Sequence, residues 1–205
     1  MAQKIYLMLK DLSDLIAIRS EFFKLKDNSM NTRQQITKIV DMYRAETRQK
    51  NINVVLMLNK VDTTICLDQE RFTQVFHACF INTLKHASNS TITVEAKIKD
   101  GEQTLSNNTV QAWVLSTGKN GDHTLQLQVA DSGWNVSNDQ RANLFKPVAL
   151  KEISEAESKP PTEFGLYIAR LITKKYGGDI IIESDPIKGS LITFEFKLDL
   201  SLIHI

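Results

Sequence analysis

The stretch that decides the fold runs from residue 163 to residue 178 and reads EFGLYIARLITKKYGG. From Phe164 onward its apolar side chains recur at helical spacing, which predicts an amphipathic helix over about residues 164–176. The pair Gly177-Gly178 is typical of a helix end, because glycine readily adopts the left-handed conformation found there. Two strands are expected after it, over residues 180–184 and 191–198.

Composition is that of an ordinary globular chain. Its 205 residues are enough for one substantial core and an appendage, with 42% hydrophobic and 24% charged residues. The formal net charge of +1 argues against a surface built for nucleic acid or acidic lipid. No apolar run approaches the roughly 20 residues that span a bilayer, and the first residues lack a signal-peptide pattern. We therefore expect a soluble segment.

Cysteines and histidines give no sign of a metal centre or a catalytic triad. Cys66 and Cys79 lack metal-ligand spacing, so we interpret them as buried thiols in a reducing compartment. The histidines are scattered along the chain and form no cluster with cysteines or carboxylates. They are His77, His86, His123 and His204.

Residues 1 to about 20 carry one apolar seam at helical spacing. Such a seam needs a partner helix, from a second copy of the chain or from sequence upstream. Because the chain begins inside this helix, we expect it to be a piece of a longer protein. The seam consists of Ile5, Met8, Leu9, Leu12, Leu15 and Ile16.

The remaining pattern predicts an α/β (α+β) two-layer sandwich, a mixed sheet with helices on one face, preceded by a dimerisation-type helix. Asp68 is the expected N-cap of a helix that runs to about residue 87. A further helix is expected over residues 32–50, and a loop over residues 151–162. The other expected strands cover residues 22–25, 52–58, 91–98, 110–115 and about 125–129, the last ending at Asp131-Ser132-Gly133.

Four partial motifs follow one another in this frame. They are RFTQVFHACFINTLKH (71–86), DSGWNV (131–136), NLFKP (143–147) and the quoted stretch from residue 163. In this order and spacing they resemble the asparagine box, first glycine box, phenylalanine box and second glycine box of the histidine kinase ATP-binding domain. That domain belongs to the wider gyrase, chaperone and mismatch-repair ATPase superfamily. The resemblance implies an ATP-binding-type domain over residues 26–200, and the end of a dimerisation and phosphoacceptor-like helical domain over residues 1–25.

The resemblance also implies roles for single residues. Asn82 would coordinate Mg²⁺ and Lys85 would face the phosphates, and both share a helical face with position 78. Asp131 would accept a hydrogen bond from the adenine amino group, and Gly133 would let the backbone approach the base. Without the other motifs, Asn82 and Lys85 would read as surface residues of an amphipathic helix. The remaining assignments are Gly165 and Leu166 at the phosphate loop and Phe145 as a packing residue.

The chain departs from the family pattern where the triphosphate would bind. Ala78 replaces a polar residue that could hold a metal or take a proton. The other phosphate-loop glycines fall on Pro161, which lacks an N–H, and on Glu163, whose charge repels phosphate. Asn135 replaces the second glycine of the first box. His77 is not a substitute for the family's phosphoacceptor, which lies upstream of the seam helix.

We therefore expect a degenerate kinase-like domain of a phosphorelay, acting as a scaffold or interaction module with weak or no ATP binding. The first alternative is an active protein-histidine kinase domain that binds ATP and Mg²⁺, and the second is a structural α/β domain without a phosphorelay role. The expected partners are a second copy, through the seam helix, and a response regulator or phosphotransfer domain. The chain is compatible with an Rcs-type phosphorelay intermediate, on the cytoplasmic face of a parent anchored in a bacterial inner membrane.

Overall fold

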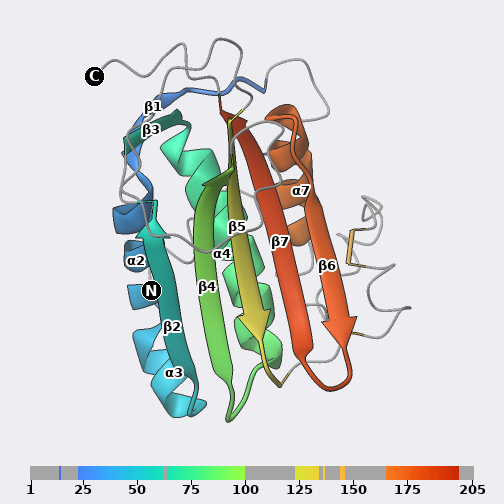
Figure 1. Ribbon diagram of the computed structural model, residues 1–205. Helices are drawn as coiled ribbons and strands as arrows, with labels where there is room; N and C mark the ends of the chain where they lie inside the picture. Colours follow the sequence, from blue (N-terminus) through green and yellow to red (C-terminus); the bar gives the residue numbers. More distant parts are fainter. Residues whose placement is uncertain are drawn as a thin grey trace.

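A computed structural model describes residues 14, 23–61, 64–99, 123–133, 136, 144–145 and 165–198. Along the chain these residues form seven strands and four helices, with strand pairs separated by helices (Figure 1). The elements are β1 (Asn28–Asn31), α2 (Thr32–Asp41), α3 (Arg44–Gln49), β2 (Asn53–Lys60), β3 (Thr64–Leu67), α4 (Gln69–His86), β4 (Thr91–Lys99), β5 (His123–Asp131), α7 (Gly165–Lys175), β6 (Ile180–Asp185) and β7 (Gly189–Leu198).

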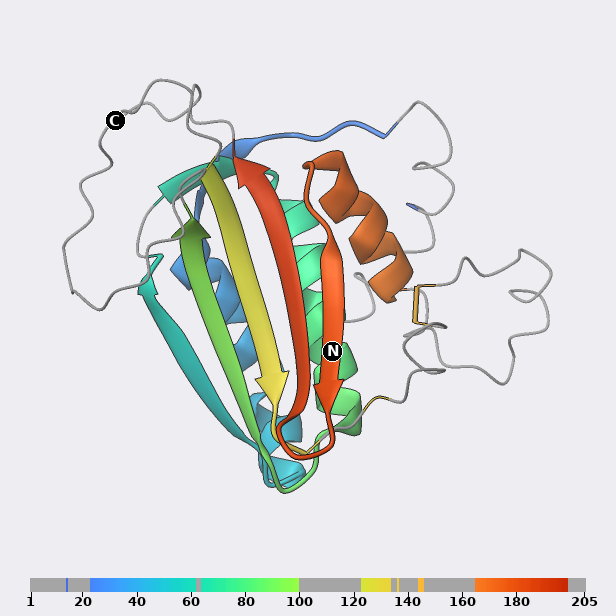
Figure 2. The same cartoon turned by 45° about the vertical axis from the view of Figure 1, so that its right-hand side comes forward.

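Five of the strands form one mixed sheet in the order β2-β4-β5-β7-β6. The β2–β4 pair is parallel and the other three pairs are antiparallel. β1 and β3 form a separate antiparallel pair. Figure 2 shows the helices of the described residues together on one side of the large sheet. The predicted two-layer sandwich is confirmed.

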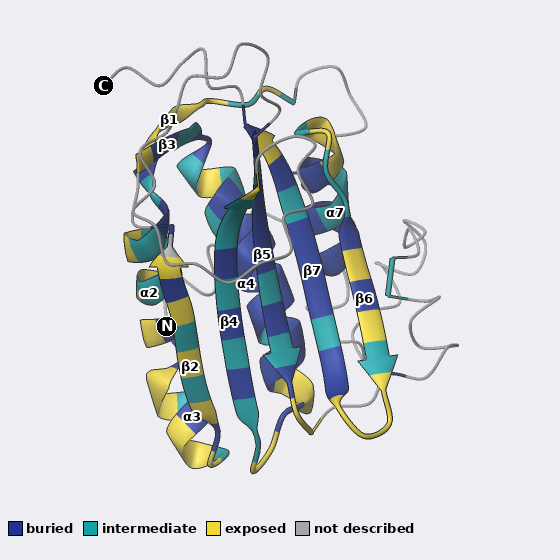
Figure 3. Cartoon of the chain, viewed as in Figure 1, coloured by how far each residue is buried: buried dark blue, intermediate teal, exposed yellow. Residues whose placement is uncertain are grey.

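The core lies between α4 and the middle of the sheet. Ile92, Val94 and Ala96 of β4 alternate with half-exposed residues and are fully buried, as strand periodicity predicts. Aromatic rings fill the space between α4 and β7: the centroid of Phe72 lies 5.8 Å from that of Phe196, and the centroid of Phe76 lies 6.3 Å from that of Phe194. Burial is deepest along β5 and β7 and falls off at the outer strands (Figure 3).

α4 begins where the sequence predicts. Asp68 Oδ1 accepts hydrogen bonds from the amides of Glu70 (3.0 Å) and Arg71 (3.1 Å), so the first turn has the cap that its free N–H groups need. The helix ends at His86, and Ala87 returns to extended backbone. α4 is therefore a long rod whose two ends lie at opposite ends of the sheet (Figure 1).

Two predictions of elements are wrong. The helix expected over residues 32–50 is broken at Met42 and Tyr43 into α2 and α3. Tyr43 is fully buried there, and its hydroxyl is hydrogen bonded to Nε2 of His77 on α4. Residues 23–25 of the expected first strand are not in a strand; β1 starts later and pairs with β3, which was not predicted.

Some predictions fall on residues that the structure does not describe. The strand expected over residues 110–115, the loop over residues 151–162 and nearly all of the seam helix lie outside the described residues. Asp14 is the exception, and its backbone is helical. Phe145 is half-buried against the core, as expected of a packing residue.

Candidate nucleotide site

Asp131 and Gly133, which the sequence resemblance assigns to the nucleotide base, lie at the end of the sheet where β5 and α4 end and the β6–β7 hairpin turns (Figure 1). Asp131 is the last residue of β5, and only 1% of its surface is exposed. Its register partners are Ile92 on β4 and Ser190 on β7, so its carboxylate lies between two neighbouring strands. A buried carboxylate at a sheet end needs hydrogen-bond donors.

Those donors come from two short segments. Ser90, between α4 and β4, donates its hydroxyl to Asp131 Oδ1 at 2.7 Å, and the amide of Gly133 donates to Oδ2 at 3.2 Å. The first contact ties Asp131 to the segment that follows α4, and the second shapes the turn after β5. A carboxylate offers about four acceptor positions, so an adenine amino group is a chemically suitable further donor.

The backbone around Asp131 is also closely packed. Gly189 opens β7 with φ of +84°, a conformation that residues with a Cβ rarely adopt. A Cβ at Gly189 would lie 1.9 Å from the carbonyl oxygen of Asp131. Glycine is therefore required for β7 to pass the end of β5 at this distance.

The asparagine-box helix brings a mixed set of side chains toward this end. Asn82 is 8% exposed, and its Nδ2 is buried without a hydrogen-bond partner among the described residues. Ala78, one turn earlier on α4, is also buried and offers only a methyl group. Lys85 is exposed. A buried amide nitrogen without a hydrogen-bond partner is a donor that a bound ligand can pair with.

The pKa of His86, in the last turn of α4, is lowered. Partial burial is the main cause, and the charges of Lys85 and Lys50 lower it further. Lys50 Nζ donates to the carbonyl of Leu84 at 2.7 Å, which caps the helix end.

α7 contributes its N-terminus, where unpaired N–H groups favour anions. Gly165 and Leu166 are the first two residues of α7. Both are buried, so neither lies in an exposed loop. Further along, Arg170 pairs with Asp179 (Nε–Oδ1 2.7 Å) and lies over the ring of Phe145 at 4.7 Å. This stack agrees with the packing role expected of Phe145.

Asp131 and Gly133 contact each other at the end of β5, and Asn82 is buried on α4. No group of three or more His, Cys, Asp or Glu residues that could hold a metal occurs in the described part of the chain. One amide oxygen is a weak site for Mg²⁺, which would need phosphate oxygens and water as its other ligands. Pro161, Glu163 and Asn135 lie outside the described residues.

The family profile described as "Histidine kinase-, DNA gyrase B-, and HSP90-like ATPase" matches residues 67–200. The chain belongs to this family. It is 21% identical over 201 residues to the signal transduction histidine-protein kinase BarA of Escherichia coli, covering 98% of this chain and 20% of BarA. The chain thus spans about a fifth of the length of this curated relative.

Solved structures of histidine kinases have the same fold. Full-length ShkA in complex with AMPPNP matches with a TM-score of 0.67 at 15% identity, over 94% of this chain and 36% of ShkA. ThkA in complex with the response regulator TrrA matches with a TM-score of 0.63 at 16% identity, over 98% of this chain and 50% of ThkA. Within the described part of this histidine kinase-like chain, no helix is long and apolar enough to cross a membrane.

Sequence reasoning missed several residues that build the site. Ser90, Ser190 and Gly189 surround Asp131, and Lys50 caps α4. Gly189-Ser190 at the start of a predicted strand was a usable signal, since glycine there marks a close backbone approach. The contacts of Ser90 and Lys50 depend on strand register and helix packing, which no local pattern reveals.

Proposed function

We propose that this chain is a degenerate histidine kinase-like domain of a phosphorelay protein, which acts mainly as a scaffold or interaction module and binds ATP weakly or not at all. The single observation that carries the proposal is the pair of positions on α4: Asn82 is retained beside a buried Ala78. The asparagine amide can contribute one metal ligand, and the alanine methyl can neither ligate a metal nor accept a proton.

The phosphate loop supports the same conclusion from the sequence. Pro161 and Glu163 stand where the family has glycines. A triphosphate is held by free backbone N–H groups and small residues, and these two residues remove one N–H and add a negative charge. Repulsion from Glu163 would cost about 1 kcal/mol or more in a partly screened site.

The retained adenine end is the reason to keep the active kinase as a second candidate. Asp131 is buried and hydrogen bonded as a base-reading carboxylate would be, and Gly133 follows it. If ATP and Mg²⁺ bind, Asn82 would contribute to holding the metal and Lys85 would neutralise phosphate charge. The bound metal would supply charge stabilisation to the transferred phosphoryl group. Gly165 and Leu166 would lie at the phosphate side.

The proposed partners follow from the organisation of the chain. We propose that residues 1–25 are the end of a dimerisation-type helical domain and that residues 26–200 are the ATP-binding-type domain. A second copy would bind through the seam from Ile5 to Ile16, and a response regulator or phosphotransfer domain would be the other partner. We also propose that the chain has the role of an Rcs-type phosphorelay intermediate. Its parent protein would be anchored in a bacterial inner membrane, with this domain on the cytoplasmic face.

Phosphoryl transfer tests the proposal. The chain is incubated with Mg²⁺ and γ-labelled ATP together with a supplied phosphoacceptor domain of a histidine kinase, and label on the acceptor is followed over time. We expect no transfer above the level of the acceptor alone. Sustained transfer that is lost in Asp131→Asn would replace the scaffold with the active kinase.

A further inference from the structure

Each oxygen of the Asp131 carboxylate already has a hydrogen-bond donor from within the chain. The hydroxyl of Ser90 donates to Oδ1 at 2.7 Å, and the amide of Gly133 donates to Oδ2 at 3.2 Å. Because only 1% of the surface of Asp131 is exposed, solvent contributes little to its hydrogen bonding. A donor on a ligand must therefore replace one of these internal hydrogen bonds or share an oxygen with it.

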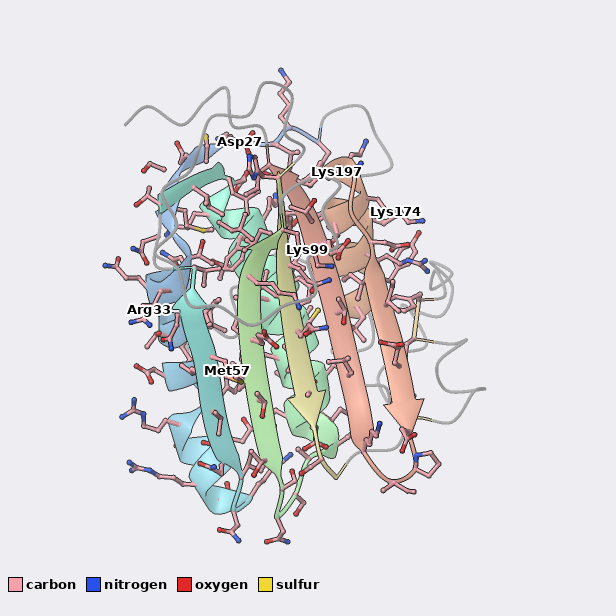
Figure 4. All side chains as sticks on the ribbon, in the orientation of Figure 1. Asp27, Arg33, Met57, Lys99, Lys174 and Lys197 are labelled. Carbon is pink, nitrogen blue, oxygen red and sulfur yellow. The ribbon has the colours of Figure 1, made fainter. Side chains whose placement is uncertain are left out.

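Both of these donors are neutral groups, and two exposed lysines of the sheet lie far from them. Lys99 and Lys197 flank Thr124 near the start of β5, whereas Asp131 is the last residue of that strand. Figure 4 shows both lysines toward the end of the sheet that lies away from the β6–β7 turn. Neither lysine can replace Ser90 as a donor to Asp131.

The main chain of Ser90 is held on two sides. Its carbonyl oxygen accepts a hydrogen bond from the amide of Asn53, the first residue of β2, at 3.0 Å. On the following residue, the Thr91 amide donates to Ser132 Oγ at 3.2 Å, and the Ser132 amide donates to the Thr91 carbonyl oxygen at 3.3 Å. These contacts fix Ser90 between β2 and the turn after β5, beside the carboxylate of Asp131.

Ser90 also occupies the space next to this turn. A Cβ on Gly133 would lie 3.2 Å from Ser90 Cβ and 3.8 Å from Asp131 Oδ2. The open side of Gly133 therefore faces both the serine and the carboxylate. A ligand group placed against the backbone at Gly133 would contact Ser90 together with Asp131.

We propose that the Ser90 hydroxyl is an internal competitor for the exocyclic amino group of an adenine base at Asp131, and that it weakens base binding separately from the phosphate side. This inference rests on the proposed function only in taking Asp131 as the residue that contacts the base. The physical reason is an exchange of hydrogen bonds. A ligand amino group that replaces the hydroxyl gains one bond as another is lost, whereas a buried acceptor without a partner would gain the full bond.

Titration with adenosine, followed by nuclear magnetic resonance of the chain, tests this role without phosphate or Mg²⁺. Ser90→Ala removes the hydroxyl and leaves an acceptor position of Asp131 unpaired. We therefore expect Ser90→Ala to bind adenosine about tenfold more tightly than the unchanged chain does, or better. A serine that only supported the shape of the site would have the opposite effect, because its removal would weaken binding.

Purine riboside separates competition at Asp131 from a general opening of the site. This compound is adenosine without the exocyclic amino group, so it cannot donate the hydrogen bond that Ser90 makes. Its affinity should be the same for Ser90→Ala and for the unchanged chain. The gain should therefore be specific to the ligand that carries the amino donor.

Ser132→Ala is the matched control for the loss of a hydroxyl at this place. Ser132 Oγ accepts from the Thr91 amide, so the change leaves the contact between Ser90 and Asp131 intact. Its affinity for adenosine should stay at that of the unchanged chain. If circular dichroism shows that Ser90→Ala does not fold, Ser90→Cys replaces it, since a thiol is a weak donor and should also raise the affinity for adenosine.

Three results would overturn the inference. They are an adenosine affinity that stays the same or falls when the Ser90 hydroxyl is removed, an equal gain for purine riboside, and an equal gain in Ser132→Ala. Because adenosine carries no phosphate, any of these results leaves the scaffold role untouched, since that role rests on Ala78 and the phosphate loop. Label transfer by the unchanged chain would contradict the scaffold role without altering the measured ratio of adenosine affinities.

Discussion

Gly189 passes the end of β5 so closely that a Cβ on it would lie 1.9 Å from the carbonyl oxygen of Asp131. This relationship joins the β6–β7 hairpin to the end of β5. The surroundings of Asp131 are therefore fixed by a close backbone contact as well as by its side-chain hydrogen bonds.

Replacing Gly189 with alanine should therefore destabilise the fold. The positive φ and the clash with Asp131 together should cost about 2–4 kcal/mol in the free energy of unfolding. Gly133→Ala is the matched control, because a Cβ there would meet nothing nearer than Ser90 Cβ at 3.2 Å. Urea denaturation of the two variants measures the difference. Equal midpoints would contradict the close approach of Gly189 to Asp131.

The ion pair between Arg170 and Asp179 gives a prediction about pH. The hydrogen bond from Arg170 lowers the pKa of Asp179, so the pair stabilises the fold above the pKa of an unfolded aspartate, near 4, and loses this contribution as pH falls through the lower folded value. Since 40% of the Asp179 side chain is exposed, the effect should stay below about 1 kcal/mol.

Asp179→Asn should thus lower the free energy of unfolding at pH 7. The deficit should shrink between pH 7 and about pH 2, as the pH falls past the unfolded aspartate value near 4 and through the lower folded value. Denaturation of both chains at several pH values in this range is the measurement. A deficit that persisted unchanged at the acidic end would show that the carboxylate charge is not what stabilises the contact.

Restoring glycine at Pro161 and Glu163 tests the cause assigned to weak nucleotide binding. The double change Pro161→Gly/Glu163→Gly returns an N–H and removes the charge, so the affinity for Mg²⁺-ATP should improve by about tenfold or more, equivalent to about 1.4 kcal/mol. Glu163→Gln changes only the charge and should give part of the gain. Calorimetric titration of the three chains would reveal an unchanged affinity if these residues are not responsible.

Periodicity predicted the large elements well, because burial decides them. β4 alternates buried and half-exposed residues along its length, and α4 has both a regular apolar face and a cap at Asp68. The alternation, the apolar face and the cap can all be read from neighbouring residues in the sequence. The five-stranded sheet with helices on one face followed from them.

The sequence failed where tertiary contacts override local preference. Tyr43 lies in the break between α2 and α3 and is buried against His77, and no local pattern near Tyr43 predicts a partner on α4. β1 and β3 have only four residues each and pair with each other.

The candidate site divides in the same way. Ordered motifs predicted Asn82 and Asp131 as site residues, and the structure places them on α4 and at the end of β5. The residues that hold Asp131 in place were not found. Ser190 lies beside it through the register of β5 with β7, and Ser90 binds it from a loop.

The affinity of the chain for Mg²⁺-ATP tests the central claim most directly. Isothermal titration should give a dissociation constant weaker than about 1 mM or no measurable heat, and Asp131→Asn should change nothing, because there is little binding to lose. A dissociation constant in the micromolar range that Asp131→Asn abolishes would contradict the account and establish a functional nucleotide site.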